Sequence, residues 1–389
     1  MEVRAGYQLT QLGVIPAEWS VLPLKQISPS QSVGLVINPS TYIDSRGTVP
    51  MLLGSDVQPN KIDFENSRKI TESSNRKIPA SQLSAGDLVI VRVGEPGITA
   101  VIPQEFDGCN CASMMIVRKG ANFDSNWLCQ LMNSDLGLSQ VHGVQYGTAQ
   151  KQFNISDAVN FLYPTPSLAE QRAIATTLSD VDALIAGLEK LITKKRDLKQ
   201  AAMQQLLTGQ TRLPGFSGEW VSVKLGDLLN VCHGKSQHAV EVPDGPYPIL
   251  ATGGQIGTAS KSLHDRPSVL IGRKGTINKP QYMDTPFWTV DTLFYCYVHL
   301  PNSAKFLFYR FLLIDWMQYN EASGVPSLNG RTIERIEVKC PNAEEQTAIS
   351  VVLSDIDADL AALEVRLAKT RALKQGMMQE LLTGRTRLV

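Results

Sequence analysis

The chain has few cysteines, no long apolar run and no excess of either charge. Six cysteines in 389 residues are too few for a disulfide framework, and Cys109 and Cys111 form one CxC motif with no second pair at zinc spacing. We therefore expect reduced structural thiols and a cytoplasmic location. The start, MEVRAGYQLTQLG, lacks the apolar stretch of a signal peptide, and no segment approaches the ~20 apolar residues of a membrane span.

Lysine plus arginine and aspartate plus glutamate both number 37, so the formal net charge is zero. Composition therefore does not by itself indicate nucleic-acid binding, although a neutral chain can carry a local basic face. A hydrophobic content of 43% is ordinary for a globular protein, and the length suggests about two or three domains.

Recognisable catalytic motifs are also missing. Gly272–Thr276 lacks the spacing of a GxxxxGK[ST] phosphate loop, and there is no HExxH motif. Asn38–Ser40 lacks the second proline and the aromatic residue of an adenine methyltransferase loop. His233 and His238 lie near Cys232, but polar loop residues are a better interpretation than a metal site. This pattern favours a protein that reads a target over one that catalyses a reaction.

A long duplication dominates the sequence. Residues 166–213 match residues 341–388 at 27 of 48 positions, at a constant offset of 175 and without a gap. The two copies end on LTGQTRL and LTGRTRL. Such a match is far above chance, so one architectural element is written twice.

Each copy predicts one long helix. Ser167 with Glu170, and Asn342 with Glu345, fit a capping box in which the cap oxygen accepts an amide N–H and the glutamate returns to the cap amide. The glycine of each closing LTG motif fits a left-handed residue after the helix. About 40 residues without proline lie between these signals, which gives a helix of about 60 Å.

Apolar residues spaced 3, 4, 3 and 4 apart occupy the same five positions in each copy, as in a coiled-coil seam. These predicted helix-pairing residues are Leu178, Val181, Ile185, Leu188, Ile192, Leu353, Ile356, Leu360, Leu363 and Leu367. After a six-residue gap the pattern resumes at Leu198 and Leu373, which we interpret as a local phase adjustment. We expect the two helices to pair antiparallel; the alternative is two ordinary amphipathic helices in a bundle core.

A second, weaker sequence repeat precedes each domain and the helix that follows it. GVIPAEW ends at Trp19 and PGFSGEW ends at Trp220, which suggests a ring of two repeats opened at one junction. We therefore expect neighbouring termini and a pseudo-two-fold axis. Short β-branched runs such as DLVIVRVG and SVLIGRKG favour a mixed α/β domain after each tryptophan, with helices near Ser125–Leu138 and Ala304–Asn320. The two domains otherwise differ strongly, which suggests one scaffold with two specificities.

The residues quoted below match a known family. The chain resembles the specificity subunit of type I restriction-modification systems over nearly its whole length. The most specific parts are PSLAEQRAIATTLSDVDALI, PNAEEQTAISVVLSDIDADL, the LLTGxTRL helix ends and SVLIGRKGTI…PFWTVDTLF. The resemblance implies an α+β fold, with two globular α/β target recognition domains separated by two long antiparallel helices that form a coiled coil.

The resemblance also implies a division of the chain and a set of partners. The expected segments are 1–19, completing the second repeat; 20–166, recognition domain 1; 167–213, spacer helix 1; 214–341, recognition domain 2; and 342–389, spacer helix 2. Each domain would read half of a bipartite, asymmetric double-stranded DNA site, and the helices would dock two modification subunits. This chain would be non-catalytic and without cofactor. S-adenosylmethionine for adenine methylation, and ATP and magnesium for the restriction subunits, would reside on those partners in a phage-defence complex.

Exposed polar loops supply the candidate DNA-binding residues, since arginine can fork onto guanine, lysine holds phosphate, and amides and hydroxyls suit base edges. In domain 1 they are Arg92, Thr99, Gln145, Tyr146, Thr148, Gln150 and Lys151. In domain 2 they are Arg273, Lys274, Thr276, Lys279, Ser323, Ser327, Asn329 and Arg331. A glycine-flanked arginine can also be no more than a solvated turn.

Polar helix residues retained in both copies are candidates for contact with a symmetric pair of partner subunits, because the seam does not require them. They are Gln171, Asp180, Asp182, Lys199, Gln200, Gln346, Asp355, Asp357, Lys374 and Gln375. Shared descent with little divergence would also explain them. Three other functions stay open: a self-contained DNA methyltransferase or nuclease, a structural two-fold adaptor, and a specificity protein of a methylation-only or phage-defence system.

Overall fold

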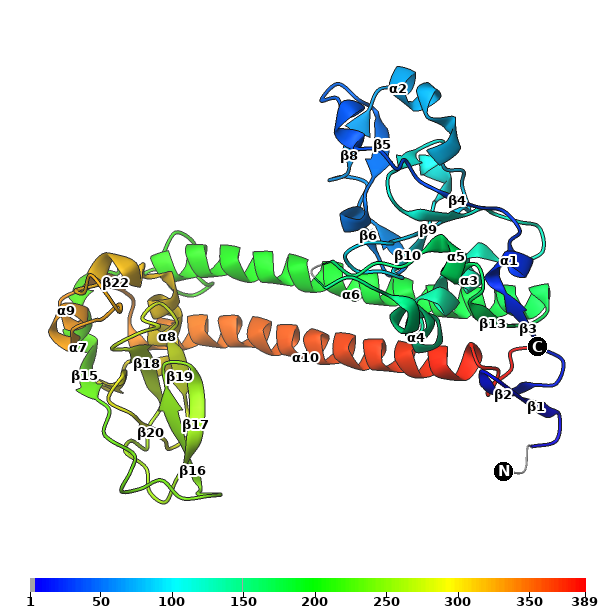
Figure 1. Cartoon of the computed structure of the whole chain (residues 1–389). Coiled ribbons are helices and arrows are strands. Elements are labelled where there is room, and N and C mark those ends of the chain that lie inside the picture. Colours follow the sequence, from blue (N-terminus) through cyan, green and yellow to red (C-terminus); the bar gives the residue numbers. More distant parts are fainter. Residues whose placement is uncertain (1–3, 149) are drawn as a thin grey trace. The chain divides into compact units, whose positions relative to one another are not determined.

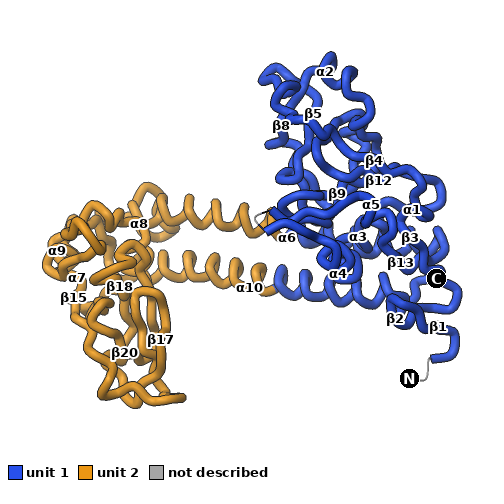
Figure 2. Tube along the Cα trace, in the orientation of Figure 1, with its two compact units in different colours: residues 1–188, 366–389 blue, residues 189–365 orange. Residues whose placement is uncertain are grey.

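A computed structural model of the chain describes residues 4–148 and 150–389. The chain divides into two compact units, Met1–Leu188 with Arg366–Val389, and Glu189–Val365 (Figure 2). Each unit contains one globular domain and part of each of two long helices. None of the helices in the described ranges combines the length and the apolar character needed to cross a membrane.

The two long helices are α6 (Leu168–Thr208) and α10 (Ala343–Leu381), and both continue through the boundary between the units (Figures 1 and 2). Their contacts in each unit show antiparallel pairing. In unit 2, Lys195 pairs with Asp359 and Lys199 pairs with Asp357, so the partner number falls as the number along α6 rises. In unit 1, the apolar cluster that holds Leu178 also holds Leu381. The predicted antiparallel helix pair is confirmed.

The predicted seam residues are all buried or half-buried, with Leu178 and Leu353 at 0% exposed. The interpretation of Leu198 and Leu373 as a continuation of the seam is wrong, because these side chains are 53% and 60% exposed. Six residues rotate an α-helix by about 600°, which leaves the side chain about 120° away from the seam. Polar side chains occupy the inner positions there instead, with Thr370 buried and Lys195 half-buried.

The domain of unit 1 contains two sheets, one of four strands and one of three strands. Its four-stranded sheet has the order β10-β9-β12-β4 and its three-stranded sheet has the order β11-β5-β8. The bounds are β4 Gln31–Val33, β5 Val49–Leu52, β8 Arg68–Ile70, β9 Leu88–Ile90, β10 Thr99–Val101, β11 Asn110–Cys111 and β12 Met115–Val117. Only the β5–β11 pair among these ladders is parallel.

The domain of unit 2 repeats this topology with different residues. Its sheets have the orders β15-β21-β18-β19 and β17-β16-β20, so the first and last strands are again neighbours in the larger sheet, and β16–β20 is again parallel. The bounds are β15 Leu229–His233, β16 Tyr247–Ala251, β17 Gly254–Ala259, β18 Ser268–Gly272, β19 Gln281–Met283, β20 Trp288–Thr289 and β21 Leu293–Val298. Two weakly similar sequences therefore form one scaffold.

Short strand pairs and helices complete the two units. Paired strands close each domain, β3 (Ser20–Pro23) with β13 (Leu162–Thr165), and β14 (Val221–Lys224) with β22 (Glu337–Cys340). The remaining elements are β1 Tyr7–Thr10, β2 Gly13–Pro16, β6 Val57–Gln58, β7 Lys61–Ile62, α1 Leu24–Ile27, α2 Glu72–Lys77, α5 Ile155–Ala158, α7 Leu225–Leu228 and α9 Gly330–Glu334, with 3-10 turns η1 Pro39–Thr41, η2 Gly54–Asp56, η3 Pro79–Ser81, η4 Gln104–Phe106 and η5 Trp316–Tyr319.

The two helices expected inside the domains are each interrupted. Helix α3 (Ser125–Met132) ends before α4 (Asp135–Val144), and α8 (Ala304–Leu313) ends before η5. A new cap explains each break, because the Ser134 hydroxyl accepts from the Gly137 amide and Asp315 accepts from the Met317 amide. Serine and aspartate compete in this way with helix continuation.

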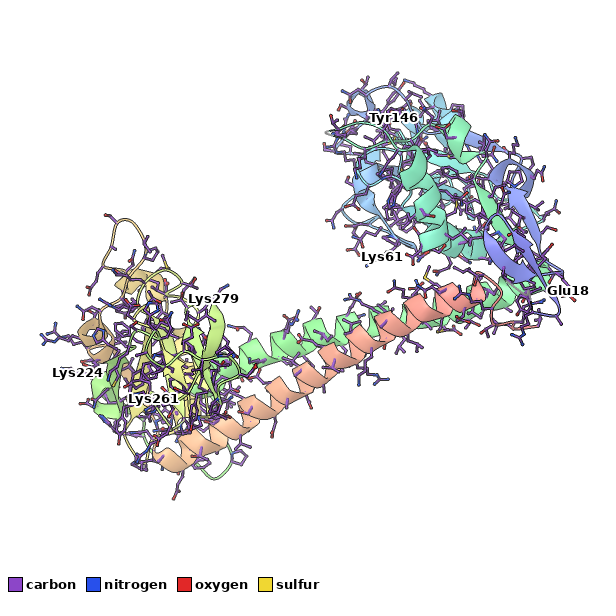
Figure 3. The ribbon with its side chains drawn as sticks, turned by 60° about the horizontal axis from the view of Figure 1, so that its bottom comes forward. Glu18, Lys61, Tyr146, Lys224, Lys261 and Lys279 are labelled. Carbon is purple, nitrogen blue, oxygen red and sulfur yellow. The ribbon has the colours of Figure 1, made fainter. Side chains whose placement is uncertain are left out.

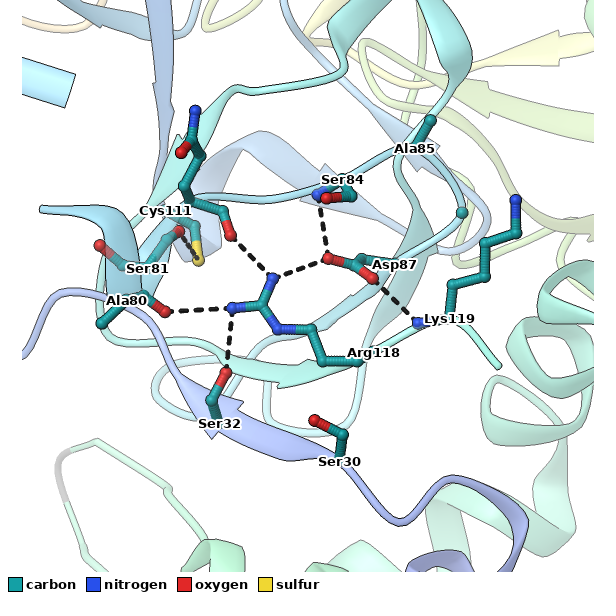
Figure 4. Close-up of polar contacts among 12 residues, drawn as sticks. Ser30, Ser32, Ala80, Ser81, Ser84, Ala85, Asp87, Cys111, Arg118 and Lys119 are labelled. Carbon is teal, nitrogen blue, oxygen red and sulfur yellow. Dashed lines mark hydrogen bonds and ion pairs between the residues drawn. The ribbon is translucent and has the colours of Figure 1, made fainter. Parts of the chain in front are cut away.

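A buried ion pair holds the larger sheet of unit 1 against the η3 segment (Figure 4). The Arg118 guanidinium donates to Asp87 at 2.7 Å, to the Gln82 carbonyl at 2.7 Å and to the Ala80 carbonyl at 3.0 Å. Asp87 is 3% exposed and also accepts from the Ser84 amide. This arginine is fully used inside the domain, so it is a structural residue.

Each long helix has a buried glutamate in its first turn, Glu170 in α6 and Glu345 in α10. The predicted caps form on one side only: the Glu170 amide donates to Ser167 and the Glu345 amide donates to Asn342. The glutamate side chains do not return to the cap, contrary to the capping-box prediction. They accept instead from the indoles and guanidinium groups of Trp19 with Arg387, and of Trp220 with Arg212.

These contacts join the start of one repeat to the end of the other within each unit. Arg387 and Arg212 occupy equivalent positions, at the sequence offset of 175. In unit 1 the Tyr7 hydroxyl also donates to the Gly384 carbonyl at 3.0 Å, which places the β1–β2 hairpin beside the end of α10 (Figure 1). Gly209 and Gly384 have φ of 74° and 70°, as predicted for left-handed residues after the helices.

Candidate nucleic-acid interface

Two candidate segments of unit 1 come together at one end of its domain. The turn after β9 pairs with the loop before α5, through a bridge between Val93 and Gln152 and a 3.1 Å bond from the Gly94 amide to the Lys151 carbonyl. Tyr146 pairs with Gln152 through two backbone bonds of 2.9 Å. The Tyr146 hydroxyl donates to the Asn154 side chain. The two segments thus form one composite polar surface, which we call tip 1 (residues 92–95, 145–148 and 150–151).

The corresponding segments of unit 2 pair in the same manner. The Gly275 amide donates to the Pro326 carbonyl at 2.9 Å, the Leu328 amide donates to the Arg273 carbonyl at 2.9 Å, and Lys274 bridges Ser327. We call this surface tip 2 (residues 273–279 and 321–331). Asn320 organises its second segment by accepting from the amides of residues 322 and 327.

Both tips contain a glycine with a left-handed backbone conformation at the equivalent turn. Gly94 and Gly275 have φ of 96° and 88°, a left-handed conformation that other L-residues adopt at a cost. Both glycine amides donate to the second segment of their own tip. The match in geometry, without a match in neighbouring residues, shows that the scaffold fixes where each tip lies and leaves its side chains free to differ.

Exposure separates the sequence candidates into accessible and inaccessible residues. Thr99 must be withdrawn as a DNA contact, because it is 0% exposed in β10 and its hydroxyl donates to the Gly97 carbonyl. Arg92 is half-buried, and its Nε atom is buried without a hydrogen-bond partner in the described structure. The exposed candidates are Tyr146, Thr148, Gln150, Lys151, Lys274, Lys279, Ser323, Asn329 and Arg331; Gln145, Arg273, Thr276 and Ser327 are half-exposed.

The two tips offer different chemistry. Tip 1 exposes Tyr146 with amide and hydroxyl groups, and Figure 3 shows Tyr146 at the surface of its domain. Tip 2 exposes more cations, among them Lys274, Lys279 and Arg331. Asn329 caps α9 through the Arg331 amide, which fixes the backbone that carries this arginine. The two tips therefore present different side-chain chemistry on the same scaffold.

A groove of about 1440 Å³ between the domain and α6 in unit 1 has the opposite electrostatic character. Its acidic lining residues are Asp63, Glu65, Glu105, Asp124 and Asp182, and its basic ones are Lys61, Lys119 and Arg172. An acidic excess repels phosphate. The tips are therefore better candidates for nucleic-acid contact than this groove.

Three cysteine thiols are buried in environments that disfavour the thiolate form. Burial raises the pKa of the Cys109 and Cys129 thiols to about 12 and that of Cys340 to about 11, whereas a nucleophilic cysteine needs a lowered pKa. Within residues 4–148 and 150–389, no three or more His, Cys, Asp or Glu side chains are grouped to hold a metal ion.

The retained polar residues of the long helices fall into three groups. Gln171 and Gln346 are each 1% exposed and hold the first turns of α3 and α8, because their Oε1 atoms accept from the Asp124 and Ser303 amides. Asp182, Asp357, Lys199 and Lys374 form ion pairs between α6 and α10. The exposed members are Asp180, Gln200, Asp355 and Gln375. Sequence periodicity gave no signal for these internal contacts.

Known proteins resemble this chain in sequence and fold. The Type I restriction modification DNA specificity domain matches residues 217–369. The Type I restriction enzyme MjaVIII specificity subunit of Methanocaldococcus jannaschii is 27% identical over 219 residues, which cover 54% of this chain and about half (51%) of that protein. The Putative type I restriction enzyme MjaX specificity subunit of the same organism is 22% identical, over 98% of this chain and 97% of its own.

A crystal structure of a type I restriction-modification S subunit from M. genitalium has the same fold. It covers 98% of both chains with a TM-score of 0.68, at 14% sequence identity. Low identity with full coverage shows that the fold is shared although most residues differ. Residues 217–369 therefore match a type I restriction-modification specificity domain, and the full-length relative and the shared fold extend the similarity to specificity subunits over nearly the whole chain.

Proposed function

We propose that this chain is the non-catalytic subunit that selects the DNA target of a type I restriction-modification complex. Tip 1 reads one half of a bipartite, asymmetric site and tip 2 reads the other half. The observation that carries this proposal is the equivalent pairing of two loop segments in both domains, with different exposed residues on each. A scaffold that is duplicated while its contact residues diverge supports two different sequence preferences.

The chemistry of the tips divides between positioning and base reading. Lys274 and Lys279 carry exposed ammonium groups suited to phosphate, whereas Arg331 can form two hydrogen bonds to guanine. Tyr146, Gln150 and Lys151 supply mixed donors and acceptors at tip 1. The zero net charge of the chain agrees with partner subunits that contribute part of the phosphate neutralisation.

Two modification subunits dock on equivalent faces of α6 and α10 in this proposal. Asp180 and Asp355 are exposed at equivalent positions, as are Gln200 and Gln375. None of these four side chains belongs to the helix seam. The modification subunits bring S-adenosylmethionine and the adenine methylation chemistry, and restriction subunits, where the host has them, bring ATP- and magnesium-dependent cleavage.

A complex limited to methylation is the second candidate, and it uses the same reading surface. The host's restriction phenotype separates the two. A self-contained methyltransferase or nuclease would have to bind S-adenosylmethionine or cut DNA as the purified chain.

The experiment that tests the proposal is a map of N6-methyladenine across the source genome, with and without this gene. The expected result is the loss of one split, asymmetric motif. Replacing tip 2 residues Lys274 and Arg331 by alanine should affect only one half of that motif. A genome whose methylation does not change, in a strain where the modification subunit is expressed, would contradict the proposal.

A further inference from the structure

One aspartate in each unit binds a recognition domain and the opposite long helix at the same time. In unit 1, Asp182 of α6 pairs with Lys374 of α10 at 2.7 Å and accepts from the Gln130 amide of α3 at 2.7 Å. The Gln130 oxygen in turn accepts from Asn60, in the turn between β6 and β7. The carboxylate thus connects three helices and, through Gln130, a loop of the domain.

The same connection recurs in unit 2 with a different domain residue. Asp357 of α10 pairs with Lys199 of α6 at 2.5 Å and accepts from the Tyr309 hydroxyl of α8 at 2.7 Å. The Tyr309 hydroxyl also contacts Ser354, and burial raises its pKa. We call each set an aspartate joint: Gln130, Asp182 and Lys374 in unit 1, and Tyr309, Asp357 and Lys199 in unit 2.

The two joints are equivalent in every position. Asp182 and Asp357, like Lys199 and Lys374, are separated by the offset of 175 that relates the repeats. Gln130 and Tyr309 each lie six residues after the cap of their domain helix, at Asp124 and Ser303. The helix residues are identical, yet the domain residue differs in type and keeps only its ability to donate to the carboxylate.

In addition to the apolar cluster that each domain helix shares with the long helices, polar contacts join it to them at two separate places along its length. The first point is its cap, whose amide donates to Gln171 or Gln346 at 2.9 Å. The second point is the joint, about 9 Å further along the domain helix. Apolar packing is non-directional, whereas hydrogen bonds at two separated points constrain the direction of the domain helix.

We propose that the aspartate joints fix the tilt of each recognition domain on the helix pair, and that this tilt sets the number of base pairs between the two half-sites. The proposal rests on the proposed function. The dimensions make the effect large: a pivot of ~10° about the cap moves a tip ~20 Å away by ~3.5 Å, and one base pair rises ~3.4 Å. Asp182, Asp357 and their partners are positioning residues that do not touch DNA.

The test compares spacer lengths within one preparation of the complete methyltransferase complex. The wild-type motif is first read from the methylome, and plasmid sites are then built with that spacer and with one base pair more or fewer. Tyr309→Phe removes the hydroxyl and keeps the ring. The preference for the wild-type spacer should fall about tenfold, because a hydrogen bond to a charged acceptor contributes about 1.4 kcal/mol or more. The sequences of both half-sites should stay unchanged.

The matched control is Tyr297→Phe, at a tyrosine that is 40% exposed on β21 and outside the joint; it should keep the wild-type spacer preference. Gln130→Leu tests the joint of unit 1 and should reduce the preference in the same way. Because the readout is a ratio between sites, a lower yield of folded complex leaves it unchanged.

The outcomes separate the joint from the proposed function. A wild-type complex that methylates one split motif, with unchanged spacer preference in Tyr309→Phe and Gln130→Leu, overturns the role of the joints alone. A wild-type complex without a split target overturns the proposed function and the joint with it. A loss of spacer preference in Tyr297→Phe as well would show a general loosening of the domain and would also overturn the specific role of the joint.

Discussion

Replacement of Arg387 by alanine should destabilise unit 1 more than the same replacement of an exposed arginine does. Arg387 donates to both carboxylate oxygens of Glu170 through Nε and Nη2. Glu170 is 1% exposed, and its other side-chain donor is the Trp19 indole at 3.0 Å. The substitution therefore removes the bidentate guanidinium from the buried Glu170 carboxylate and leaves the neutral Trp19 indole as its side-chain donor.

The size of the effect follows from burial on each side of the pair. Removing one partner of a buried ion pair costs about 3–5 kcal/mol, because the remaining charge is desolvated and unpaired. The Arg387 side chain is 29% exposed, so water reaches its outer edge and the pair is not wholly buried. We therefore expect a loss of about 2–3 kcal/mol in the free energy of unfolding.

Equilibrium urea unfolding, followed by circular dichroism, measures this loss. Arg385→Ala is the matched control two residues away, since that side chain is 63% exposed and its ion pair with Glu380 is 3.7 Å long; it should change stability by less than about 0.5 kcal/mol. Adding Glu170→Gln to Arg387→Ala should restore part of the stability, because a neutral amide does not require a cation.

Two results would refute this reasoning. One is an Arg387→Ala variant no less stable than Arg385→Ala. The other is a double variant whose loss in the free energy of unfolding equals the sum of the losses in the two single variants. Residues that contact each other should instead show a coupling energy of about 0.5–3 kcal/mol.

Three further predictions concern the helices and the tips. Leu188→Asp should cost about 3 kcal/mol or more, because the side chain is 5% exposed in the seam, whereas Leu184→Asp at 44% exposed should cost less than about 1 kcal/mol in the same unfolding assay. Gly384→Ala should destabilise the fold by about 1–3 kcal/mol, because the φ of Gly384 is 70° and the added Cβ would lie 2.4 Å from a ring atom of Pro16. Gly376→Ala should instead stabilise α10 by about 0.5–1 kcal/mol, because a Cβ at this position meets open space. Thermal unfolding of the two variants measures both effects. Arg331→Ala should weaken binding of the assembled complex to its specific DNA target by about 1–3 kcal/mol. An unchanged Kd on the mapped target would exclude Arg331 as a DNA-reading residue.

The duplication predicted the helices well, because a helix start, a 3.6-residue period and a glycine stop are local signals. Leu198 and Leu373 show where this reasoning fails. Retention in both copies and an apolar side chain suggested a place in the seam, yet both leucines face away from it. Periodicity assigns a face only while the spacing stays at three or four, and a six-residue gap moves a side chain to another face.

The glutamates at the helix starts were assigned to the wrong partners for a related reason. A capping box is a local pattern, and Glu170 satisfies it in sequence. In the fold, however, the glutamate accepts from Arg387, which is 217 residues away in the chain, and from Trp19. A bidentate arginine offers a carboxylate more than a backbone amide does. Only tertiary structure brings these groups together, so sequence alone could not choose between the two partners.

The tips were found because glycines and polar residues mark turns, although their composite nature was not visible. The sequence predicted two separate candidate segments in each domain, 52 residues apart for Gly275 and Ser327. In the fold they pair along their backbones. Thr99 failed as a candidate since it lies two residues beyond Gly97, inside β10, where its side chain is buried. Distance from a turn in sequence does not report the direction in which a strand carries its side chain.

The retained polar residues of the helices lead to a narrower view of where partners dock. Retention in both repeats indicates a constraint that both halves share, and contact with a symmetric pair of subunits is one such constraint. The aspartate joints and the buried glutamines satisfy the same criterion inside the chain, because each unit must hold its own domain by the same means. Retention alone therefore does not separate the two causes, but exposure does. Asp180, Gln200, Asp355 and Gln375 belong to neither the seam nor the aspartate joints and are open to solvent, so partner contact should be sought there first.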